Sequence, residues 1–486
     1  MQPTLKTYLL GVDQGSSATK GILLDPETGR ILAKARARIA TRRWQKGSSL
    51  FVEHNPEEIL QSVQTVLKKL LRHAPRSAAL RLGIASQRSS FLLIDPADGR
   101  ALTPVISWQD TRGLGLVEKL KPHAPRVHRT TGLYLTPYYT LSKLLWLLEK
   151  SPSLKARAAR GKVKLAFIPT YLAARLTKEG QFAADPTLAQ RSLLINLRTA
   201  QWDSGLIDAF GLPKTLLPKI LDTSANYGTI SLNGYAIKIS AMIGDQQAAY
   251  LALQAGRPGK RALMNLGTGG FLLLGAGAEP RRYPGLLTGI AWRRKGRSEY
   301  LAEGTVTSIS GVLKWLEGLG ILKTSDRFEM PRPQDFKRLP HVTGSFGGLA
   351  SPFWRGDLKV RLDGLDHTTT REQILGAFLL GLGHLFWEIL KPLKSARPKK
   401  IIVSGGLSKS RGLLEILANY LDAVLEPVED ADLSALGAAL AAHSGPIKIP
   451  ITLGMAVKPS AKYRKPLKAY RAKAEQTLRE MLKARS

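Results

Sequence analysis

The sequence predicts an α/β protein of two domains that face one cleft. Three observations support this fold class. The chain has 486 residues, which is too long for one compact core. Two glycine- and hydroxyl-rich hairpins lie about 250 residues apart, which suggests two halves of related design. A strand, a glycine pair and a helix follow near the C-terminal end, where free backbone groups could meet a ligand.

The first hairpin is the stretch LLGVDQGSSATKGILLD. Apolar runs at Leu9–Val12 and Gly21–Leu24 flank a polar turn at residues 15–17, a pattern that predicts two strands. A turn of this composition suits phosphate, yet the carboxylate of Asp13 stands at its mouth. A carboxylate and a phosphate repel each other unless a cation lies between them. The stretch therefore indicates a nucleotide that is bridged by a metal.

The second hairpin repeats this arrangement. Apolar runs at Ala262–Met264 and Phe271–Leu274 flank a Gly-Thr-Gly turn. Two unrelated tight hairpins are the alternative, because the internal similarity is short. Between the hairpins, GRPGK at residues 256–260 interrupts an Ala/Leu-rich run. We therefore predict an N-terminal domain over residues 1–255, a C-terminal domain over 256–446 and a basic C-terminal tail over 447–486.

Two helices have clear start signals and are predicted to be scaffold. In the first, Asn55 is the expected N-cap and Pro56 the first helical residue, and an apolar stripe follows. In the second, Thr370 and Gln373 form the pattern of a capping box. The apolar run at residues 376–390 within it is too short to span a membrane and contains two ionisable side chains, so it predicts a buried helix.

Two further segments could contact a ligand. Ile401–Val403 is a predicted buried strand, Gly405 and Gly406 allow close approach, and the helix after Ser410 presents free N–H groups to an anion or nucleotide. Asp245 ends an apolar run directly before a predicted helix and near the domain boundary. Phosphoryl transfer to an alcohol needs a group that takes the hydroxyl proton. Asp245 could be that base, or it could cap its helix.

Charge and composition narrow the functional classes. The chain has 72 Lys and Arg against 37 Asp and Glu, a net charge of +35, which would attract nucleic acid, anionic lipid or ATP. These bases are dispersed and lack interleaved aromatic residues, which favours solvated faces. There is no cysteine, and no leader pattern opens the chain, so a cytoplasmic location is predicted. The P-loop and G-x-G-x-x-G patterns are missing, which argues against P-loop and dinucleotide-binding enzymes.

Taken together, the motifs strongly resemble those of the FGGY carbohydrate kinases and, within them, the glycerol kinases. The resemblance runs in family order from about Tyr8 to about His443. The matching motifs are GVDQGSSATK, FVEHNPEEI, GIASQRSS, ISWQDTR, TGLYLTPYYTLSKLLWLL, IGDQQAA, NLGTGG, LAEGTV, FGGLASPFW, and SGGLSKS with SALGAALAA. The resemblance implies an actin-like ATPase fold, with two α/β domains on ribonuclease-H-like cores that close an interdomain cleft over ATP and an alcohol.

The resemblance also implies roles for individual residues. Asp245 matches the family's general base, and Asp13 matches the aspartate associated with magnesium. The nucleotide positions are Gly15, Ser16, Ser17, Lys20, Gly267, Thr268, Gly405, Gly406 and Ser410. The acceptor positions are Arg88, Ser89, Trp108, Tyr138, Asp245 and Gln246. Plain core aromatics are the alternative for Trp108 and Tyr138, and a plain exposed hairpin lysine is the alternative for Lys20.

Three features depart from the glycerol kinase pattern. Ser89 stands where those enzymes have a glutamate after the arginine of a QRE motif, which removes a charged hydroxyl acceptor and makes room for a longer polyol or ketose. Leu380 stands where the family's helix usually carries glutamate. The basicity is not explained by a neutral acceptor, although it would raise encounter rates with ATP at low salt.

The sequence therefore predicts a kinase that uses ATP and Mg²⁺ to phosphorylate a hydroxyl of glycerol or a related polyol or sugar. A pentulose or tetritol kinase of the same family is the alternative, with xylulose, ribulose or erythritol as acceptor. A non-catalytic nucleic-acid-binding protein on the same fold is the alternative of another class. The expected partners are a small polyol or sugar and ATP or ADP. A membrane is not expected, a nucleic acid is not favoured, and the acceptor, a homodimer and regulation stay open.

Overall fold

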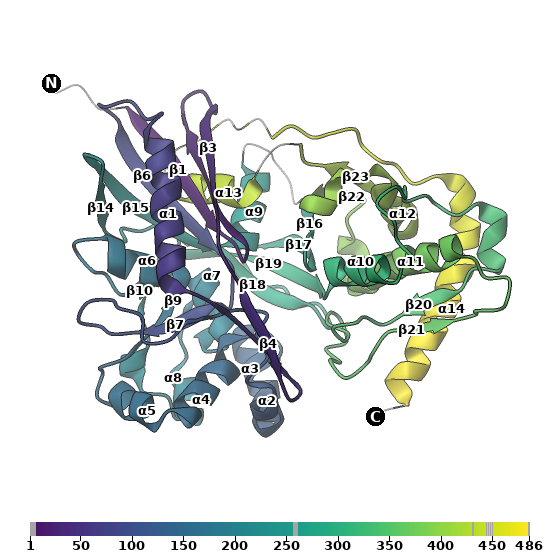
Figure 1. Cartoon of the computed structure of the whole chain (residues 1–486), viewed down its shortest axis with the longest axis horizontal. Coiled ribbons are helices and arrows are strands. Elements are labelled where there is room, and N and C mark those ends of the chain that lie inside the picture. Colours follow the sequence, from purple (N-terminus) through teal and green to yellow (C-terminus); the bar gives the residue numbers. More distant parts are fainter. Residues whose placement is uncertain are drawn as a thin grey trace.

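The computed structural model describes residues 6–255, 261–429, 432–443, 445, 447, 449 and 451–484. The N-terminal half of the chain forms one lobe and most of the C-terminal half forms the other (Figure 1). The predicted linker at residues 256–260 lies outside the described residues, so the domain boundary stays a prediction.

The N-terminal lobe is built on a six-stranded sheet in the order β14-β15-β6-β1-β2-β3. The first three strands pair antiparallel in sequence, and β6 and β15 extend the sheet in parallel beside β1. The strands of the first hairpin therefore form as predicted. The bounds are β1 Thr7–Gln14, β2 Ala18–Leu24, β3 Ile31–Arg38, β6 Ala79–Ser86, β14 Thr229–Leu232 and β15 Tyr235–Gly244.

The C-terminal lobe contains a second six-stranded sheet, in the order β18-β19-β17-β16-β22-β23. Here β16, β17 and β19 pair antiparallel, and β22 and β23 run parallel beside β16. Both sheets thus share one plan, three antiparallel strands and then two parallel ones, which confirms two ribonuclease-H-like halves. The bounds are β16 Ala262–Leu266, β17 Gly270–Gly277, β18 Leu287–Arg294, β19 Arg297–Val306, β22 Lys400–Ser404 and β23 Val424–Pro427.

Smaller sheets and helices surround this framework. A five-stranded sheet in the order β4-β5-β8-β7-β9 enlarges the N-terminal lobe. Its bounds are β4 Arg42–Lys46, β5 Ser49–His54, β7 Phe91–Ile94, β8 Val105–Ile106 and β9 Lys164–Phe167. Two-stranded sheets pair β10 Ala183–Ala184 with β13 Lys219–Ile220, β11 Ile195–Asn196 with β12 Gln201–Trp202, and β20 His341–Thr343 with β21 Arg361–Asp363.

The helices follow the predicted start signals where these were clear. Asn55 caps α1 by accepting a hydrogen bond from the Glu57 N–H, and Thr370 and Gln373 form the expected capping box of α11. In the N-terminal half the helices are α1 Pro56–Leu71, α2 Leu114–Leu120, α3 Ala124–Thr131, α4 Thr140–Lys150, α5 Pro152–Ala159, α6 Ile168–Leu176, α7 Pro186–Ala189, α8 Ser204–Ala209 and α9 Asp245–Gln254. Those that follow are α10 Ile309–Gly318, α11 Arg371–Leu390, α12 Arg411–Leu421, α13 Leu433–Ala441 and α14 Arg464–Lys483.

Helix α13 belongs to the C-terminal half of the sequence but packs on the N-terminal sheet. A side chain at Gly11 in β1 would overlap the carbonyl of Ala435, and one at Gly83 in β6 would overlap that of Ala438. Glycine is needed at both strand positions because the helix backbone lies so close. On its other side α13 packs against α9, where Gly437 meets Ala248. These two helices therefore join the two halves of the molecule.

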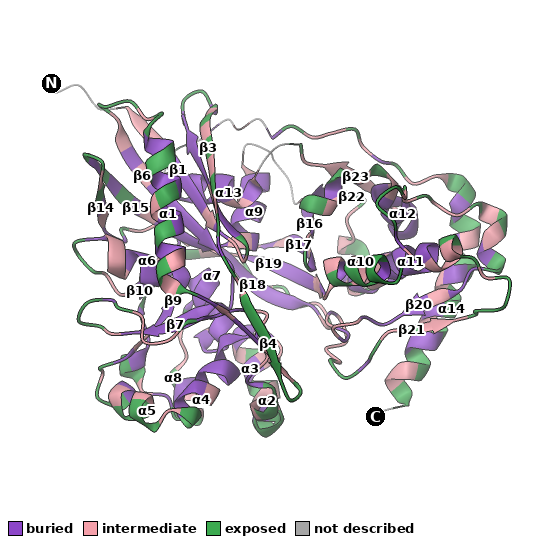
Figure 2. Cartoon of the chain, viewed as in Figure 1, coloured by how far each residue is buried: buried purple, intermediate pink, exposed green. Residues whose placement is uncertain are grey.

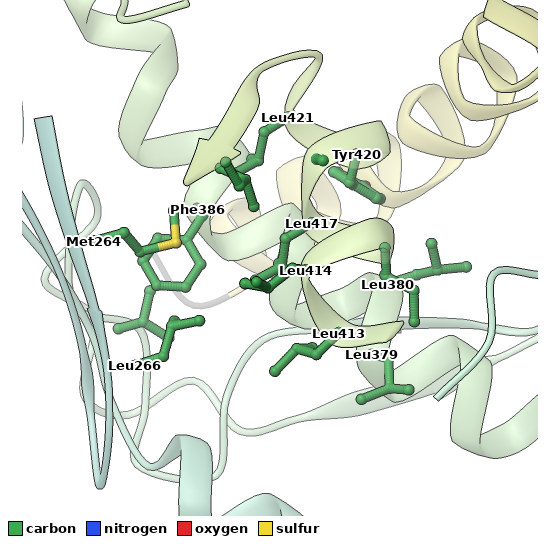
Figure 3. Close-up of a cluster of buried hydrophobic side chains, with 14 of the residues drawn as sticks. Met264, Leu266, Leu379, Leu380, Phe386, Leu413, Leu414, Leu417, Tyr420 and Leu421 are labelled. Atoms are coloured by element: carbon green, nitrogen blue, oxygen red, sulfur yellow. The ribbon is translucent and has the colours of Figure 1, made fainter. Parts of the chain in front are cut away.

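The buried residues follow the central strands of both sheets, whereas the outer side of α1 and all of β4 are exposed (Figure 2). The largest hydrophobic cluster lies in the C-terminal lobe, between β16 and helices α11 and α12 (Figure 3). Leu380 is fully buried in this cluster beside Leu379. A glutamate at this position would have to be buried among leucines, so this departure from the family pattern concerns packing.

Two further predictions concern α11 and the basic C-terminal stretch. The segment Arg371–Ala396 is long and apolar enough to cross a membrane, but 72% of its most apolar window is buried inside the protein. The prediction of a buried core helix is therefore confirmed. Half of the stretch predicted as a separate basic tail forms α14, which packs on the C-terminal lobe through buried Leu467, Tyr470 and Leu478.

Candidate active site

Asp13 lies near the end of β1, opposite Lys20 on β2. The Gly15 N–H donates to the Ala18 carbonyl at 3.0 Å and closes the turn of the hairpin. The Oδ1 atom of Asp13 is buried and has no hydrogen-bond partner among the described residues. Burial raises the pKa of Asp13 well above its usual range, the carboxylates of Asp432 and Asp245 raise it further, and Lys20 opposes them. This carboxylate therefore lacks the partner that a buried charge requires.

Lys20 makes an ion pair with Asp432, which immediately precedes α13, at 2.8 Å. The lysine is 45% exposed, so it is neither buried nor a plain solvated side chain. Asp432 could not be singled out from local patterns, because the contact joins two residues more than 400 positions apart along the chain. Its position before the SALGAALAA helix was the only available signal.

Asp245 is the first residue of α9 and follows β15 directly. The N-cap position is held by Gly244, so Asp245 is not the N-cap residue, although its carboxylate does bind an N–H group of the first turn. Its Oδ1 accepts a hydrogen bond from the Gln246 N–H at 2.8 Å and lies 3.5 Å from Nε of Arg88. Burial raises the pKa of Asp245, while Arg88 and the Gln246 N–H oppose that shift.

A buried cluster of three charges holds Arg88 in this position. Glu303 in β19 accepts two hydrogen bonds from Arg88, at 2.6 and 2.9 Å, and one from Arg191 at 2.6 Å. None of the three side chains is more than 7% exposed. Although burial opposes ionisation, the guanidinium groups of Arg191 and Arg88 lower the pKa of Glu303 to about 2. Glu303 and Arg191 were missed, although a glutamate inside the apolar motif LAEGTV was a signal that a partner must exist.

Trp108 links the acceptor positions to the first hairpin. Its indole Nε1 donates to Ser16 Oγ at 3.1 Å, and Ser16 Oγ donates to Gln87 Oε1 at 3.2 Å. Gln87 Nε2 in turn donates to Gln14 Oε1 at 3.2 Å. A residue predicted to contact the acceptor and a residue predicted to contact phosphate thus share one hydrogen bond. Since Trp108 is half-buried and has a polar partner, a purely apolar core role does not describe it.

Ser89 and Tyr138 lie in the same region of the N-terminal lobe. Ser89 is buried and has a φ of 63°, in the left-handed region that residues other than glycine seldom adopt. Its carbonyl oxygen accepts a hydrogen bond from Thr140 Oγ1 at 3.4 Å, which places it beside the start of α4. Tyr138 is half-buried, and burial raises the pKa of its hydroxyl.

The second hairpin meets α9 through its first strand. Asn265 at the end of β16 donates from Nδ2 to Gln246 Oε1 at 3.1 Å. The turn that follows is closed by a hydrogen bond from the Gly267 N–H to the Gly269 carbonyl at 3.0 Å, and Thr268 is exposed. The second hairpin therefore lies close to the start of α9, where Asp245 lies, and the charge of Asp245 also acts on Asp13 in the first hairpin.

The glycine pair after β22 lies beside the second hairpin, because β22 pairs with β16 as far as Ser404. Gly405 has a φ of 96°, and a side chain there would overlap the carbonyl of Leu266. Gly406 is exposed and a side chain there would point into open space. Ser410 is the N-cap of α12 and accepts from the Leu413 N–H at 3.4 Å. The predicted nucleotide residues of the C-terminal lobe are thus neighbours, except that the Ser410 side chain serves its own helix.

Comparison with known proteins adds independent information. Residues 8–252 match the N-terminal domain, and residues 262–445 the C-terminal domain, of the FGGY family of carbohydrate kinases. The glycerol kinase of Thermus brockianus is 36% identical over 449 residues, which cover 90% of each chain. Plasmodium falciparum glycerol kinase with ADP aligns with a TM-score of 0.81 at 24% identity over 97% of this chain and 98% of that chain. A ligand-bound xylulose kinase from Lactobacillus acidophilus gives 0.82 at 21% identity over 98% and 99%.

Proposed function

The chain belongs to the FGGY family of carbohydrate kinases, and from that premise we propose that it transfers the γ-phosphate of ATP to a primary hydroxyl of glycerol or a related polyol or sugar, with Asp245 as the general base. That the protein is a phosphotransferase with an alcohol group as acceptor and ATP as donor follows from the family and from its glycerol kinase relatives. The catalytic roles of individual residues, the role of Mg²⁺ and the identity of the acceptor are the proposal.

The position of Asp245 supports the proposal most directly. It begins the helix to which the second hairpin is hydrogen-bonded, its charge acts on Asp13 in the first hairpin, and its carboxylate lies 3.5 Å from a buried guanidinium. Because burial raises the pKa of Asp245, its carboxylate is a stronger base than that of an exposed aspartate. The positive charge of Arg88 lowers this pKa and so favours the ionised carboxylate. Both properties suit a group that must accept a proton from an alcohol.

In the reaction, Asp245 takes the proton of the acceptor hydroxyl. The hydroxyl oxygen forms a bond to the γ-phosphorus, the bond from that phosphorus to the β–γ bridging oxygen breaks, and ADP leaves. Arg88 orients the acceptor beside Asp245, since Glu303 fixes two of its N–H groups and leaves others to donate. The glycine-rich turns offer backbone N–H groups to the phosphates.

Asp13 is suited to a magnesium ion that accompanies ATP. Its Oδ1 is buried without a hydrogen-bond partner, and two neighbouring carboxylates raise its pKa, so a cation would stabilise its ionised form. The described residues include no cluster of three or more His, Asp or Glu side chains that could hold a metal. That agrees with Mg²⁺, which takes one or two carboxylates together with phosphate oxygens and water. When bound, the ion neutralises charge on the phosphates.

The choice of acceptor depends on which residue stands at position 89. The glutamate of the glycerol kinase pattern is replaced by a short neutral side chain, so one strong partner for a hydroxyl is lost. The xylulose, ribulose and erythritol kinase alternatives therefore stay compatible with the site. A cytoplasmic location and a homodimer also stay predictions.

The test is ADP production by the purified protein with Mg²⁺ and ATP in the presence of glycerol, erythritol, xylitol, xylulose or ribulose. We expect one acceptor to raise turnover far above the rate without acceptor. Asp245→Asn should lower kcat by roughly 10²–10⁴-fold, the usual contribution of a general base. The control is Asp326→Asn, which removes a carboxylate paired with Arg371 in the C-terminal lobe. Turnover that no acceptor stimulates, or an Asp245→Asn variant as active as the parent, would overturn the proposal.

A further inference from the structure

Lys143 is a fully buried lysine that the proposed reaction does not use. It lies in α4 and is 0% exposed. Its Nζ lies 2.9 Å from the carbonyl oxygens of both Ser107 and Tyr138, and 3.4 Å from that of Ser89. An ammonium group has three N–H donors, and here three backbone carbonyls accept from it.

The three carbonyls belong to the chain segments that carry the acceptor positions. Ser89 and Tyr138 are themselves such positions, and Ser107 directly precedes Trp108. The segments come from different parts of the chain: the turn after β6, the turn after β8 and the loop before α4. One side chain therefore ties together three loops that would otherwise move independently.

Ser89 shows why such a tie is needed. A φ of 63° costs an L-residue free energy, so the conformation persists only when its surroundings hold it. The bonds from Lys143 and from Thr140 to its carbonyl do this. The backbone of Ser89 is thereby held directly after Arg88, whose Nε lies 3.5 Å from Asp245.

The electrostatic environment of Lys143 indicates that this side chain does more than fill space in the core. Burial lowers the pKa of Lys143 to about 7, with Asp110 favouring the charged form and Arg112 opposing it. In the part of the chain that the structure describes, its ammonium forms no ion pair, because Asp110 pairs with Arg112 instead. A methionine or leucine would fill the same space without this desolvation cost. The hydrogen bonds that its ammonium group donates therefore account for a buried lysine at this position.

We propose that Lys143 is a positioning residue for the acceptor alcohol, because its ammonium fixes the three backbone segments that carry the acceptor side chains. The inference rests on the proposed function of this site. Among the described hydrogen bonds Lys143 contacts no predicted nucleotide residue directly, and an indirect link runs through Ser107 and Trp108 to Ser16, so its effect on the acceptor should exceed its effect on the nucleotide.

The first measurement compares Lys143→Met and Lys143→Arg with the parent protein, using the best acceptor of the panel. We expect Lys143→Met to raise the KM for the acceptor by roughly 10- to 100-fold, because small misplacements of binding groups have effects of this size. The KM for ATP should change less than about twofold. Lys143→Arg should recover part of the loss, since it keeps the charge. The control is Lys391→Met, which removes a lysine bound to Glu388 in the C-terminal lobe and should change neither KM.

The second measurement does not depend on activity. Hydrogen–deuterium exchange is followed by mass spectrometry in the parent, Lys143→Met and Lys391→Met proteins. In Lys143→Met, faster exchange confined to residues 87–90, 107–110 and 134–139 supports the proposal. Exchange that increases equally across the N-terminal lobe, or an acceptor KM equal to that of the parent, overturns it. A parent protein that phosphorylates no alcohol overturns the proposed function and the acceptor role together, while the exchange still shows whether Lys143 orders the three segments.

Discussion

Glu303→Gln tests whether the buried ion cluster sets the chemistry of the base. The change keeps the shape of the side chain but removes the charge that accepts three hydrogen bonds, at 2.6, 2.9 and 2.6 Å, from two guanidinium groups. None of the three side chains is more than 7% exposed. Removing one partner of such a buried pair costs about 3–5 kcal/mol, so we expect the free energy of unfolding to fall by an amount in this range.

The variant should also change the pH dependence of the reaction. Asp245 must be ionised to accept a proton, so kcat/KM for the acceptor falls as the pH falls through the pKa of Asp245, which burial raises. The negative charge of Glu303 raises that pKa further, and the positive charge of Arg88 lowers it. In Glu303→Gln the opposing negative charge is gone, so the acid limb of the profile should move to lower pH.

The assay is the pH profile of kcat/KM together with thermal unfolding of the same samples. Glu388→Gln is the matched control, because Glu388 is also largely buried, at 7% exposed, and is ion-paired with Lys391 at 2.8 Å, whereas Glu303 is paired with Arg88 and Arg191. It should lose stability and keep the acid limb of the parent. A folded Glu303→Gln protein whose acid limb coincides with that of the parent, or lies at higher pH, would refute the reasoning.

Four further outcomes are expected. Burial and two carboxylates raise the pKa of Asp13, so protons compete with Mg²⁺ for this side chain. The Mg²⁺ concentration that gives half-maximal turnover should therefore rise as the pH falls. A concentration that does not change with pH would mean that Asp13 is not part of the metal site. Gly405→Ala, which places a side chain against the Leu266 carbonyl at a φ of 96°, should raise the KM for ATP and leave that for the acceptor, as initial rates would reveal. Ser89→Glu should increase the ratio of kcat/KM for glycerol to that for xylulose by roughly 10-fold or more, and an equal ratio would mean that this position does not select the acceptor. Leu380→Glu buries a carboxylate among leucines and should lower the melting temperature strongly in calorimetry, whereas a stable variant would contradict the assigned packing.

Local patterns predicted the elements on which the site is built. Both hairpins, the N-cap Asn55 and the capping box at Thr370 depend on residues that are neighbours in the sequence, and all of them form. Asp245 could be singled out because it sits where an apolar strand meets a helix. The order of the family motifs then indicated which of these elements belong to one site.

The contacts that give the site its charge balance could not be predicted in this way. Glu303 lies 215 residues from Arg88 and 112 from Arg191, so no local pattern connects them. The placement of α13 on the N-terminal sheet was also missed, because it depends on how close two backbones approach at Gly11 and Gly83. Tertiary packing decides such contacts.

Part of the basic surface has a structural explanation. On β3, which is an edge strand of the first sheet, exposed Lys34, Arg36 and Arg38 alternate with half-buried alanines. Charged side chains along an edge discourage pairing with the edge of another molecule. The dispersion of bases noted in the sequence therefore includes a strand where charge has a role that needs no polyanion.

The two lobes present different kinds of groups to their proposed ligands. In the C-terminal lobe an apolar cluster supports the strands that carry the glycine turns, and the predicted phosphate positions in these turns offer backbone N–H groups. Around the acceptor positions, Arg88, Arg191 and Lys143 of the N-terminal lobe and Glu303 of β19 are all buried charges, although each is costly to bury. A neutral polyol offers only hydroxyl groups, so it can be oriented only by donors and acceptors that are already held in place. If the proposed acceptor site is right, this accounts for the buried charge around it, and a single change there, such as serine at position 89, is expected to alter the choice of acceptor without altering the fold.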